Sequence, residues 1–496
     1  MNKKRAITLL TLTASLLAFS GSLSACNSYD GLTINFWHTF GKTPADSIEA
    51  QAQKFASLVE AHEGVKLRIK FTYKGTYDDI LSNITKSFAS GETPTIAVAY
   101  PDHVADYFAA ESTPGQYIVN LDNYMNDPEI GFGKESWLGD QYDSSDFVEA
   151  FLKEGQDYSR EGTYSLPYMK SSEVMFYNLS AVRKAMPYYD PTIETDDDIK
   201  DFMDNISWNE LMDFCEIIND NKATILDSLL VPAFYDSDGN LFISKMYQNN
   251  IPFASLNENG SASIDFNGHA TTSFTPSEDQ ITAYNETVSM LSGLKSSYDK
   301  GLFTTKGVYG EYGSNNFVQQ KTIFSIGSSG GAGYNFPSSS TFDVGICKVP
   351  SSNNNPMYVS QGPTLTVFNS PRYSTSENAT LTKYAYKFIK YLTNGEVNSD
   401  LCINGSEGYV PVRESAYSTE DFLYFMENGE KYAKTADVVI HDIDGNYINT
   451  PVFKGSATLR DEVAGALADV MRLSSNDTES IETILNRCLS NAISKM

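Results

Sequence analysis

The stretch that decides the fold class is residues 32–99, LTINFWHTFGKTPADSIEAQAQKFASLVEAHEGVKLRIKFTYKGTYDDILSNITKSFASGETPTIAVA. Leu32–Trp37 is apolar enough to predict a first strand. Thr43 is expected to cap a helix that has Pro44 at its first position. Apolar residues then alternate with polar ones over Val65–Phe71, which predicts a second strand. The stretch therefore begins as strand, helix and strand.

The second half of the same stretch repeats this order. Tyr77–Ala89 places apolar residues on one helical face, and Gly91 is expected to end that helix. Thr95–Ala99 follows as a third strand. Strands that alternate with helices predict an α/β fold with a largely parallel sheet.

The rest of the chain continues as further short elements without an internal repeat or a long linker. Because about 470 residues beyond the N-terminal segment exceed what one hydrophobic core serves, two lobes are expected, with their strands interleaved along the chain. The expected segments are 1–26 as a signal peptide, 27–172 and 345–380 in the first lobe, and 173–344 and 381–496 in the second. Further strands are predicted at Ser165–Tyr168, Val174–Tyr177, Lys321–Ile326, Phe342–Val349 and Thr364–Phe368, and further helices at Leu179–Met186, Trp208–Asn219, Leu381–Leu392 and Arg460–Met471.

The N-terminal segment predicts export. Lys3, Lys4 and Arg5 precede an apolar run, 6–19, which is too short to span a bilayer. The run is followed by Leu23-Ser24-Ala25-Cys26, which resembles the bacterial lipobox, so we expect a lipid on Cys26 and a protein anchored to the outer side of the cell membrane. The alternative is an ordinary secretory signal with a chance cysteine.

The charge balance excludes some classes of partner. The chain has 36 basic and 63 acidic residues, a formal net charge of −27. Such a surface repels nucleic-acid backbones and anionic headgroups, so neither is expected as the main partner. A small anion in a locally basic pocket remains compatible with this charge.

No metal or cofactor is predicted. The five histidines show no ligand spacing, and Asp196–Asp198 is interpreted as a solvated turn. Asp236–Asn240 and Asp442–Asn446 look like calcium loops, but each lacks the Glu expected at position twelve, so both are interpreted as turns between strands. Four cysteines are expected to be small buried hydrophobes: Cys215, Cys347, Cys402 and Cys488.

Gly327-Ser328-Ser329-Gly330-Gly331 fits the G-x-S-x-G pattern of serine hydrolases. The only downstream histidine is His441, directly beside Asp442, and adjacent residues rarely orient one another as triad members. We therefore favour a glycine-rich turn whose unpaired N–H groups open a helix and suit an anion or a hydroxyl group. A secreted hydrolase using Ser329 remains the alternative.

Several motifs carry a family resemblance that covers roughly residues 33–490. In chain order they are Phe36-Trp37-His38, Tyr73-Lys74-Gly75-Thr76-Tyr77, Met175-Phe176-Tyr177-Asn178, Ser328-Ser329-Gly330 and Gly408-Tyr409-Val410-Pro411. Together they resemble family 1 of the bacterial extracellular solute-binding proteins, the substrate-binding lipoproteins of ABC transporters. Within that family, the pattern is most similar to the branch that binds sn-glycerol 3-phosphate and glycerophosphodiesters.

The resemblance implies a two-lobed, periplasmic-binding-protein type II-like fold with hinge crossovers and a ligand cleft between the lobes. It also implies the positions of the ligand-binding residues. Where the family pattern has a Glu after the third strand, this chain has Asp102, and the branch's Trp-rich segment corresponds to residues 234–242, which contain no Trp. The residues implied to bind ligand are Tyr77, Asp102, Ser171, Ser328, Gly362, Tyr409 and Arg460.

The function implied is that of a non-enzymatic, monomeric receptor that delivers a small polar solute to ABC permease subunits in the membrane. Hydroxyl groups, backbone N–H groups and the guanidinium of Arg460 suit a phosphate ester. Three alternatives remain open: a receptor for a sugar or oligosaccharide, in which aromatic platforms would matter more, the secreted hydrolase, and a surface adhesin with a decayed cleft.

Overall fold

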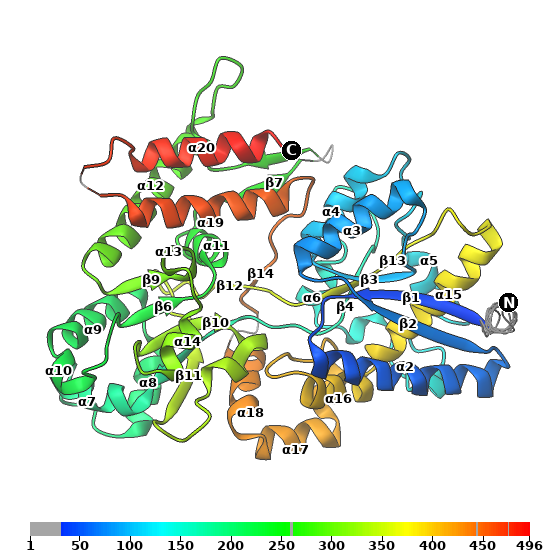
Figure 1. The fold of residues 1–496 in the computed structure, drawn as a ribbon, viewed down its shortest axis with the longest axis horizontal. Helices are drawn as coiled ribbons and strands as arrows, with labels where there is room; N and C mark the ends of the chain where they lie inside the picture. Colours follow the sequence, from blue (N-terminus) through cyan, green and yellow to red (C-terminus); the bar gives the residue numbers. More distant parts are fainter. Residues whose placement is uncertain (1–30, 258–260, 443–444, 475) are drawn as a thin grey trace, which may run out of the picture.

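The structure is a computed structural model that describes residues 31–257, 261–442, 445–474 and 476–496. The expected signal peptide and Cys26 lie outside these residues. Two five-stranded sheets lie in two lobes, seen on the right and left of Figure 1, and the chain passes repeatedly between them. The two-lobed α/β fold is therefore confirmed.

Lobe 1 is built on a sheet with strand order β2-β1-β3-β13-β4. The first three strands are parallel, and β13 pairs antiparallel with both β3 and β4. The parallel part is the strand-helix alternation predicted from residues 32–99. The bounds are Leu32–His38 for β1, Leu67–Tyr73 for β2, Ile96–Ala99 for β3, Leu166–Pro167 for β4 and Thr364–Val367 for β13.

Helices cover both faces of this sheet. On one face Phe36 packs with Phe55 and Phe388 of two helices, and on the other Ile80, Ile84 and neighbouring rings form a second cluster. The helices of lobe 1 are α2 (Lys42–Glu63), α3 (Tyr77–Ser90), α4 (Pro101–Ala110), α5 (Asp122–Met125), α6 (Glu149–Lys153), α15 (Thr375–Leu392) and α16 (Gly395–Gly405), with the short turns η1 (Ser136–Leu138), η2 (Ser144–Asp146) and η4 (Glu414–Ser418).

Lobe 2 has a mixed sheet with strand order β11-β5-β10-β6-β9. β10 is parallel to β6 and antiparallel to β5, so the sheet changes direction between these neighbours. A small hairpin, β7 (Ala254–Leu256) with β8 (Ala262–Ile264), is separate from it. The bounds are Glu173–Asn178 for β5, Ala233–Tyr235 for β6, Phe303–Thr305 for β9, Phe324–Ser328 for β10 and Val344–Lys348 for β11.

The helices of lobe 2 pack around that sheet, and the two C-terminal helices lie together along one side of it (Figure 1). Ser207 and Ser277 each begin a long helix with a reciprocal capping box. The helices are α7 (Leu179–Tyr189), α8 (Asp196–Asn205), α9 (Trp208–Asp220), α10 (Lys222–Ile225), α11 (Asp238–Gln248), α12 (Glu278–Asp299), α13 (Lys306–Tyr309), α14 (Gly313–Val318), η3 (Ser329–Asn335), α19 (Ser456–Arg472) and α20 (Ile481–Ile493).

Three segments meet where the chain crosses between the lobes. Lys170 exchanges backbone hydrogen bonds with Val410, and Ser171 does so with Gln361. Beside them β12 (Tyr358–Val359) pairs with β14 (Tyr447–Ile448), which Figure 1 shows in the middle of the molecule. Two helices, α17 (Glu420–Asn428) and α18 (Glu430–Asp437), and the π-helical turn η5 (Val438–Asp442) complete the connection. This crossing region positions backbone from both lobes at the site described below.

Two of the expected lobe boundaries fall inside elements. The boundary at 344/345 falls within β11, which pairs with β5 and so belongs to lobe 2. The boundary at 380/381 falls within α15, which packs on β1 and α2 of lobe 1 together with α16. Both differences have one cause: a boundary read along the chain ignores which sheet an element pairs with or covers.

Local corrections concern polar clusters and helix starts. Asp196–Asp198 is exposed to solvent, as predicted, but it forms the first turn of a helix, α8, where Asp198 and Thr195 form a capping box. Asp238 likewise begins α11, so 236–240 is a strand-to-helix connection and not a turn between strands. The first predicted helix is capped by Gly41, two residues before Thr43. The 442–446 turn lies partly outside the described residues.

Two further observations concern the membrane and the cysteines. None of the described helices combines the length and the apolar character needed to cross a bilayer. Four cysteines are buried free thiols, which confirms the prediction that they serve as small hydrophobes: Cys215, Cys347, Cys402 and Cys488.

Candidate ligand-binding cleft

A cavity of about 970 Å³ lies between the two lobes, at the crossing region. Its walls come from α3 and α4 of lobe 1, from β10 and α19 of lobe 2, and from the crossing segments. Seven of the lining residues are those that the family resemblance implied: Tyr77, Asp102, Ser171, Ser328, Gly362, Tyr409 and Arg460. The structure therefore brings together residues that lie up to 383 positions apart in the sequence.

Tyr77 is held by the start of α3. Thr76 caps the helix, and its backbone and side chain both donate to the Asp79 carboxylate, at 2.9 Å each. The Tyr77 ring stacks on Tyr100 with centroids 3.9 Å apart and 16° between the planes. Burial is the main cause that raises the pKa of the Tyr77 hydroxyl, so it stays a neutral hydrogen-bonding group at physiological pH.

Ser171, Gly362 and Tyr409 come from the three crossing segments. The hydrogen bonds between Ser171 and Gln361, 2.9 and 3.0 Å long, place Gly362 beside the start of lobe 2. Gly362 has φ +110° and lies against the backbone carbonyl of Met169, so a side chain there would have no room. The close approach of these backbones requires glycine at this position.

The glycine-rich turn ends β10 and starts η3. Ser328 lies at 3.4 Å from Ser171, hydroxyl to hydroxyl, and accepts a 3.3 Å hydrogen bond from the N–H of Gly330. The N–H of Ser329 donates to the carbonyl of Ser172 at 2.8 Å. Two N–H groups expected to be unpaired are thus already bonded, and the Ser328 hydroxyl of this turn lines the cavity beside the hydroxyl of Ser171.

Arg460 lies in the first turns of α19 and reaches the cavity from lobe 2. Its guanidinium donates to the side-chain oxygen of Asn240, and no carboxylate pairs with it among the residues that the structure describes. The other two lysine or arginine side chains of the cavity are engaged, since Lys170 pairs with Glu154 at 2.5 Å and Lys306 lies 3.8 Å above the Tyr312 ring. Among these three cations, Arg460 is therefore the one whose guanidinium keeps N–H groups available for a ligand.

Asp102 lies in the first turn of α4, where its carboxylate accepts from the backbone N–H of His103 at 2.9 Å. It is one of many acids around the cavity. Burial is the main cause that raises the pKa of both Asp106 and Asp461, and the charge of nearby Asp102 adds to it. Acids therefore line the cavity from both lobes, with Asp102 and Asp106 on α4 and Asp461 beside Arg460 on α19.

Sequence reasoning missed two acids of lobe 2 that line the cavity, one buried and one half-buried. Glu173 begins β5 and is only 2% exposed, and burial raises its pKa to about 7. Asp236 follows β6 and accepts a hydrogen bond from the Gly313 N–H, and burial raises its pKa to about 6. Neither residue has a motif around it, so the only signal was a charged residue next to an apolar strand.

The aromatic residues of the cavity are all tyrosines. In the segment that corresponds to the family's Trp-rich stretch, Phe234, Tyr235 and Phe242 are fully buried and do not line the cavity. The rings that do line it are Tyr77, Tyr100, Tyr312, Tyr334 and Tyr409. Any stacking surface for a ligand must therefore come from these rings.

The arrangement expected for a serine hydrolase is not formed. Ser329 is fully buried, and the closest hydrogen bond of its hydroxyl is to the backbone N–H of Ser172 at 3.4 Å. His441 is exposed and bonds with Asp437. Across the described part of the chain, no three His, Cys, Asp or Glu residues are arranged to hold a metal ion.

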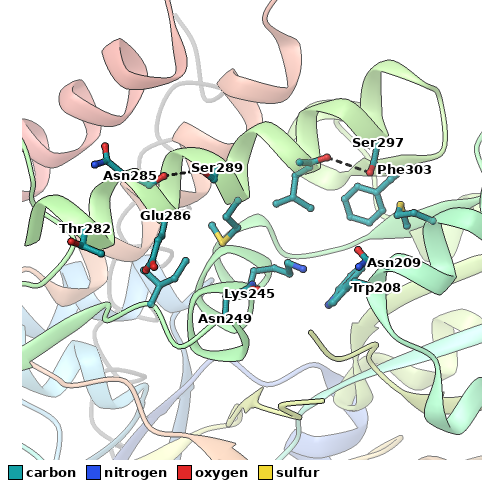
Figure 2. Close-up of a pocket in the computed structure, with 15 residues that line it drawn as sticks. Trp208, Asn209, Lys245, Asn249, Thr282, Asn285, Glu286, Ser289, Ser297 and Phe303 are labelled. Carbon is teal, nitrogen blue, oxygen red and sulfur yellow. Dashed lines mark hydrogen bonds between the residues drawn. The ribbon is translucent and has the colours of Figure 1, made fainter. Parts of the chain in front are cut away.

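A second cavity, of about 620 Å³, lies within lobe 2 and contains none of the seven residues. Figure 2 shows it between α12 and the segment from Trp208 to Asn209, with Lys245 directed toward the indole ring. Lys245 donates to the Ser352 hydroxyl at 2.8 Å and lies 5.1 Å from the Trp208 ring centroid. Burial lowers its pKa to about 8. No sequence pattern marked this cavity.

Comparison with known proteins agrees with this architecture. Residues 50–433 match the profile of a family described as "Bacterial extracellular solute-binding protein". Over 176 residues, the chain is 30% identical to the sn-glycerol-3-phosphate-binding periplasmic proteins of Escherichia coli K12 and Escherichia coli O1:K1. The match covers 36% of this chain and 35% of those relatives. The chain thus matches about a third of their length.

Solved structures share the fold over nearly the whole chain. A cyclic α-maltosyl-1,6-maltose binding protein from Arthrobacter globiformis has a TM-score of 0.63 and 16% identity, covering 93% of this chain and 100% of that one. UgpB from Mycobacterium tuberculosis, solved in complex with glycerophosphocholine, has a TM-score of 0.60 and 16% identity, covering 93% and 98%. Because the family profile spans most of the chain and the fold agrees, this chain belongs to the bacterial extracellular solute-binding proteins of ABC transporters.

Proposed function

We propose that this protein is the receptor of an ABC importer for sn-glycerol 3-phosphate or a glycerophosphodiester, which it binds in the cleft and delivers to the permease. The observation that carries the proposal is the Arg460 guanidinium, which lines the cavity without a carboxylate partner in the described structure. A guanidinium with free N–H groups matches phosphate oxygens in both geometry and charge.

The groups around Arg460 are those that a phosphate ester needs. Ser171 and Ser328 supply hydroxyl donors 3.4 Å apart, and Tyr77 and Tyr409, which also line the cavity, supply two more. The acids of lobe 1, Asp102 among them, suit the hydroxyl groups of glycerol as hydrogen-bond acceptors. The partial likeness to sn-glycerol-3-phosphate-binding proteins supports the same ligand class.

An oligosaccharide is the second candidate. The cavity volume lies near the upper end of the range for small-molecule sites, about 300–1,000 Å³, and exceeds what glycerol phosphate alone would fill. Five tyrosines line it, and tyrosine rings can stack on sugar faces. A large cavity also favours a diester over a monoester within the first proposal.

The lipobox-like sequence supports an anchored location. We propose that Cys26 carries the lipid and holds the receptor at the outer face of the cell membrane, near its permease. In cells, mass spectrometry of the purified N-terminal peptide tests this: a diacylglycerol-modified Cys26 supports it, and an unmodified or differently cleaved terminus contradicts it.

Titration calorimetry with sn-glycerol 3-phosphate, glycerophosphocholine and maltose distinguishes the ligand classes. We expect the two phosphate esters to bind and maltose not to bind. Arg460→Ala should weaken phosphate-ester binding by at least about a hundredfold, because a charge-assisted contact is lost in a partly buried site. Arg487→Ala is the matched control, since Arg487 lies on α20 in an exposed ion pair with Glu479. Maltose binding that is unaffected by Arg460→Ala would favour the oligosaccharide receptor.

A further inference from the structure

A chain of buried hydrogen bonds links Arg460 to an acid that no family motif contains. Tyr235 donates its hydroxyl to one oxygen of Glu173, and the Asn240 amide donates to the other oxygen at 3.0 Å. The Asn240 carbonyl oxygen then accepts from the Arg460 guanidinium. Glu173 and Asn240 are each 2% exposed, so water does not compete for these bonds. The chain runs from β6 and β5 through α11 to α19.

The chemistry of an amide gives this chain a direction. An ionised carboxylate only accepts hydrogen bonds, so Asn240 must turn its NH₂ group toward Glu173. Its oxygen then faces the opposite way, toward Arg460. Because α11 and α19 also pack directly against each other, at Gly239 and Arg460, the guanidinium has a fixed support.

We propose that Glu173 is a positioning residue for anionic ligands: through Asn240 it holds the Arg460 guanidinium at the cleft, and its charge sets how strongly that guanidinium attracts a phosphate ester. This inference rests on the proposed function, because it assigns Arg460 to the ligand's anionic group. Glu173 itself touches Tyr235 and Asn240 and acts through them.

The charge of Glu173 gives the proposal a pH signature. Burial raises its pKa to about 7, against a smaller lowering by the nearby Arg460 charge, and a bound anion would raise it further. The affinity for an anion should therefore be constant below about pH 7 and should weaken as the pH rises above it, because the free protein then carries an ionised Glu173, and the anion must bind beside that charge or wait for the carboxylate to take up a proton.

The contribution of Glu173 to the pH profile must be distinguished from the contributions of the other charged groups near it. Asp236 on β6 has a pKa raised to about 6, while Tyr235 on β6 has a pKa raised far above neutrality by burial. The neighbouring cation is Arg460 on α19, and β10 contributes Ser328, whose hydroxyl carries no charge. Asp236→Asn therefore serves as the second background in which the profile is measured.

The test measures affinity for glycerophosphoglycerol, whose single phosphate charge does not titrate between about pH 6 and about pH 9, by calorimetry on the whole protein. We expect wild-type affinity to weaken about tenfold over this range, in the Asp236→Asn background as well. Glu173→Gln, whose amide oxygen still accepts from Asn240, should bind at all these pH values as tightly as wild type does at about pH 6.

Asn240→Ala breaks the link without altering Glu173. It should weaken binding about five- to tenfold at every pH, because the Arg460 side chain must then be ordered by the ligand. Asn267→Ala is its matched control, since Asn267 is a buried amide of lobe 2 outside the cavity and should leave affinity unchanged. A thermal unfolding scan of each variant verifies that it is folded.

The outcomes separate the two proposals. If wild type binds glycerophosphoglycerol but Glu173→Gln keeps the wild-type pH profile, or Asn240→Ala binds like wild type, the role of Glu173 is wrong and the proposed function stands. If wild type binds no phosphate ester at any pH, both proposals fail together.

Discussion

Gly330 and Gly331 differ in what surrounds them, although they are adjacent in the same turn. A Cβ added to Gly330 would lie 2.6 Å from the ring of Tyr409, closer than real carbon atoms approach. A Cβ added to Gly331 would meet its nearest neighbour, Tyr334, at 3.8 Å, an ordinary contact. A side chain at the first glycine would therefore collide with Tyr409, whereas the second glycine has room for one.

We expect Gly330→Ala to displace the Tyr409 ring and to weaken ligand binding about tenfold, since overpacking costs about 1–3 kcal/mol. Gly331→Ala in the same turn should leave the affinity within about twofold of wild type. Calorimetry with the ligand identified for the wild type measures both. Equal affinities for the two variants would show that ligand binding does not depend on the present position of the Tyr409 ring.

Among the elements, α15 is anchored by two lysines that point into lobe 1 instead of into solvent. Lys390 is fully buried, donates to the carboxylate of Glu135 at 2.7 Å and to the carbonyl of Ile130 at 2.8 Å, and lies 3.2 Å from Asp140. Lys387, one helical turn earlier, shares the Glu135 carboxylate at 2.6 Å. Both lysines of α15 thus pair with buried acids of lobe 1.

Removing one member of that network should destabilise lobe 1. We expect Lys390→Met to lower the free energy of unfolding by about 3–5 kcal/mol, because it leaves buried carboxylates with too few partners. Lys42→Met is the control on α2, where the pair with Asp46 is exposed on both sides and should change stability by less than about 0.5 kcal/mol. Urea unfolding followed by circular dichroism measures both, and a loss below about 1 kcal/mol for Lys390→Met would contradict the expectation.

At the scale of the whole molecule, the buried acids of the cleft couple stability to pH. Glu173 has a pKa near 7 in the folded protein against about 4.3 in the unfolded chain. Because the folded pKa is the higher one, the folded protein binds the proton more tightly. The stability that this provides is complete below about pH 4 and is lost as the pH rises to about 7.

We therefore expect wild type to lose about 3 kcal/mol more unfolding free energy between about pH 4 and about pH 8 than Glu173→Gln does. Asp236, whose pKa burial also raises, is present in both proteins and cancels in the comparison. Thermal unfolding of the unliganded proteins across this range measures the difference. Parallel curves for the two proteins would show that Glu173 titrates normally.

Much of this architecture follows from short-range patterns. Alternation and helical spacing in residues 32–99 predicted β1 to β3, α2 and α3, because each strand or helix must bury one side of itself. The end of α3 at Gly91 was also predicted, and the structure shows the reason, because Gly91 adopts φ +73°, a conformation that glycine reaches without strain. The seven cleft residues were found by resemblance to a family and not by any local rule, and their convergence on one cavity needed the structure.

The tertiary structure alone decided which groups the buried charges pair with. Glu173 meets Asn240 across 67 positions and Lys390 meets Glu135 across 255. Whether an acid is solvated, paired or left with a raised pKa depends on which elements pack around it, and chain order does not contain that information. By itself the sequence determined the strands and helices of residues 32–99, because those depend on neighbours a few residues away. Pairing between distant segments decided where the lobes end, where the cleft opens and which cation faces it.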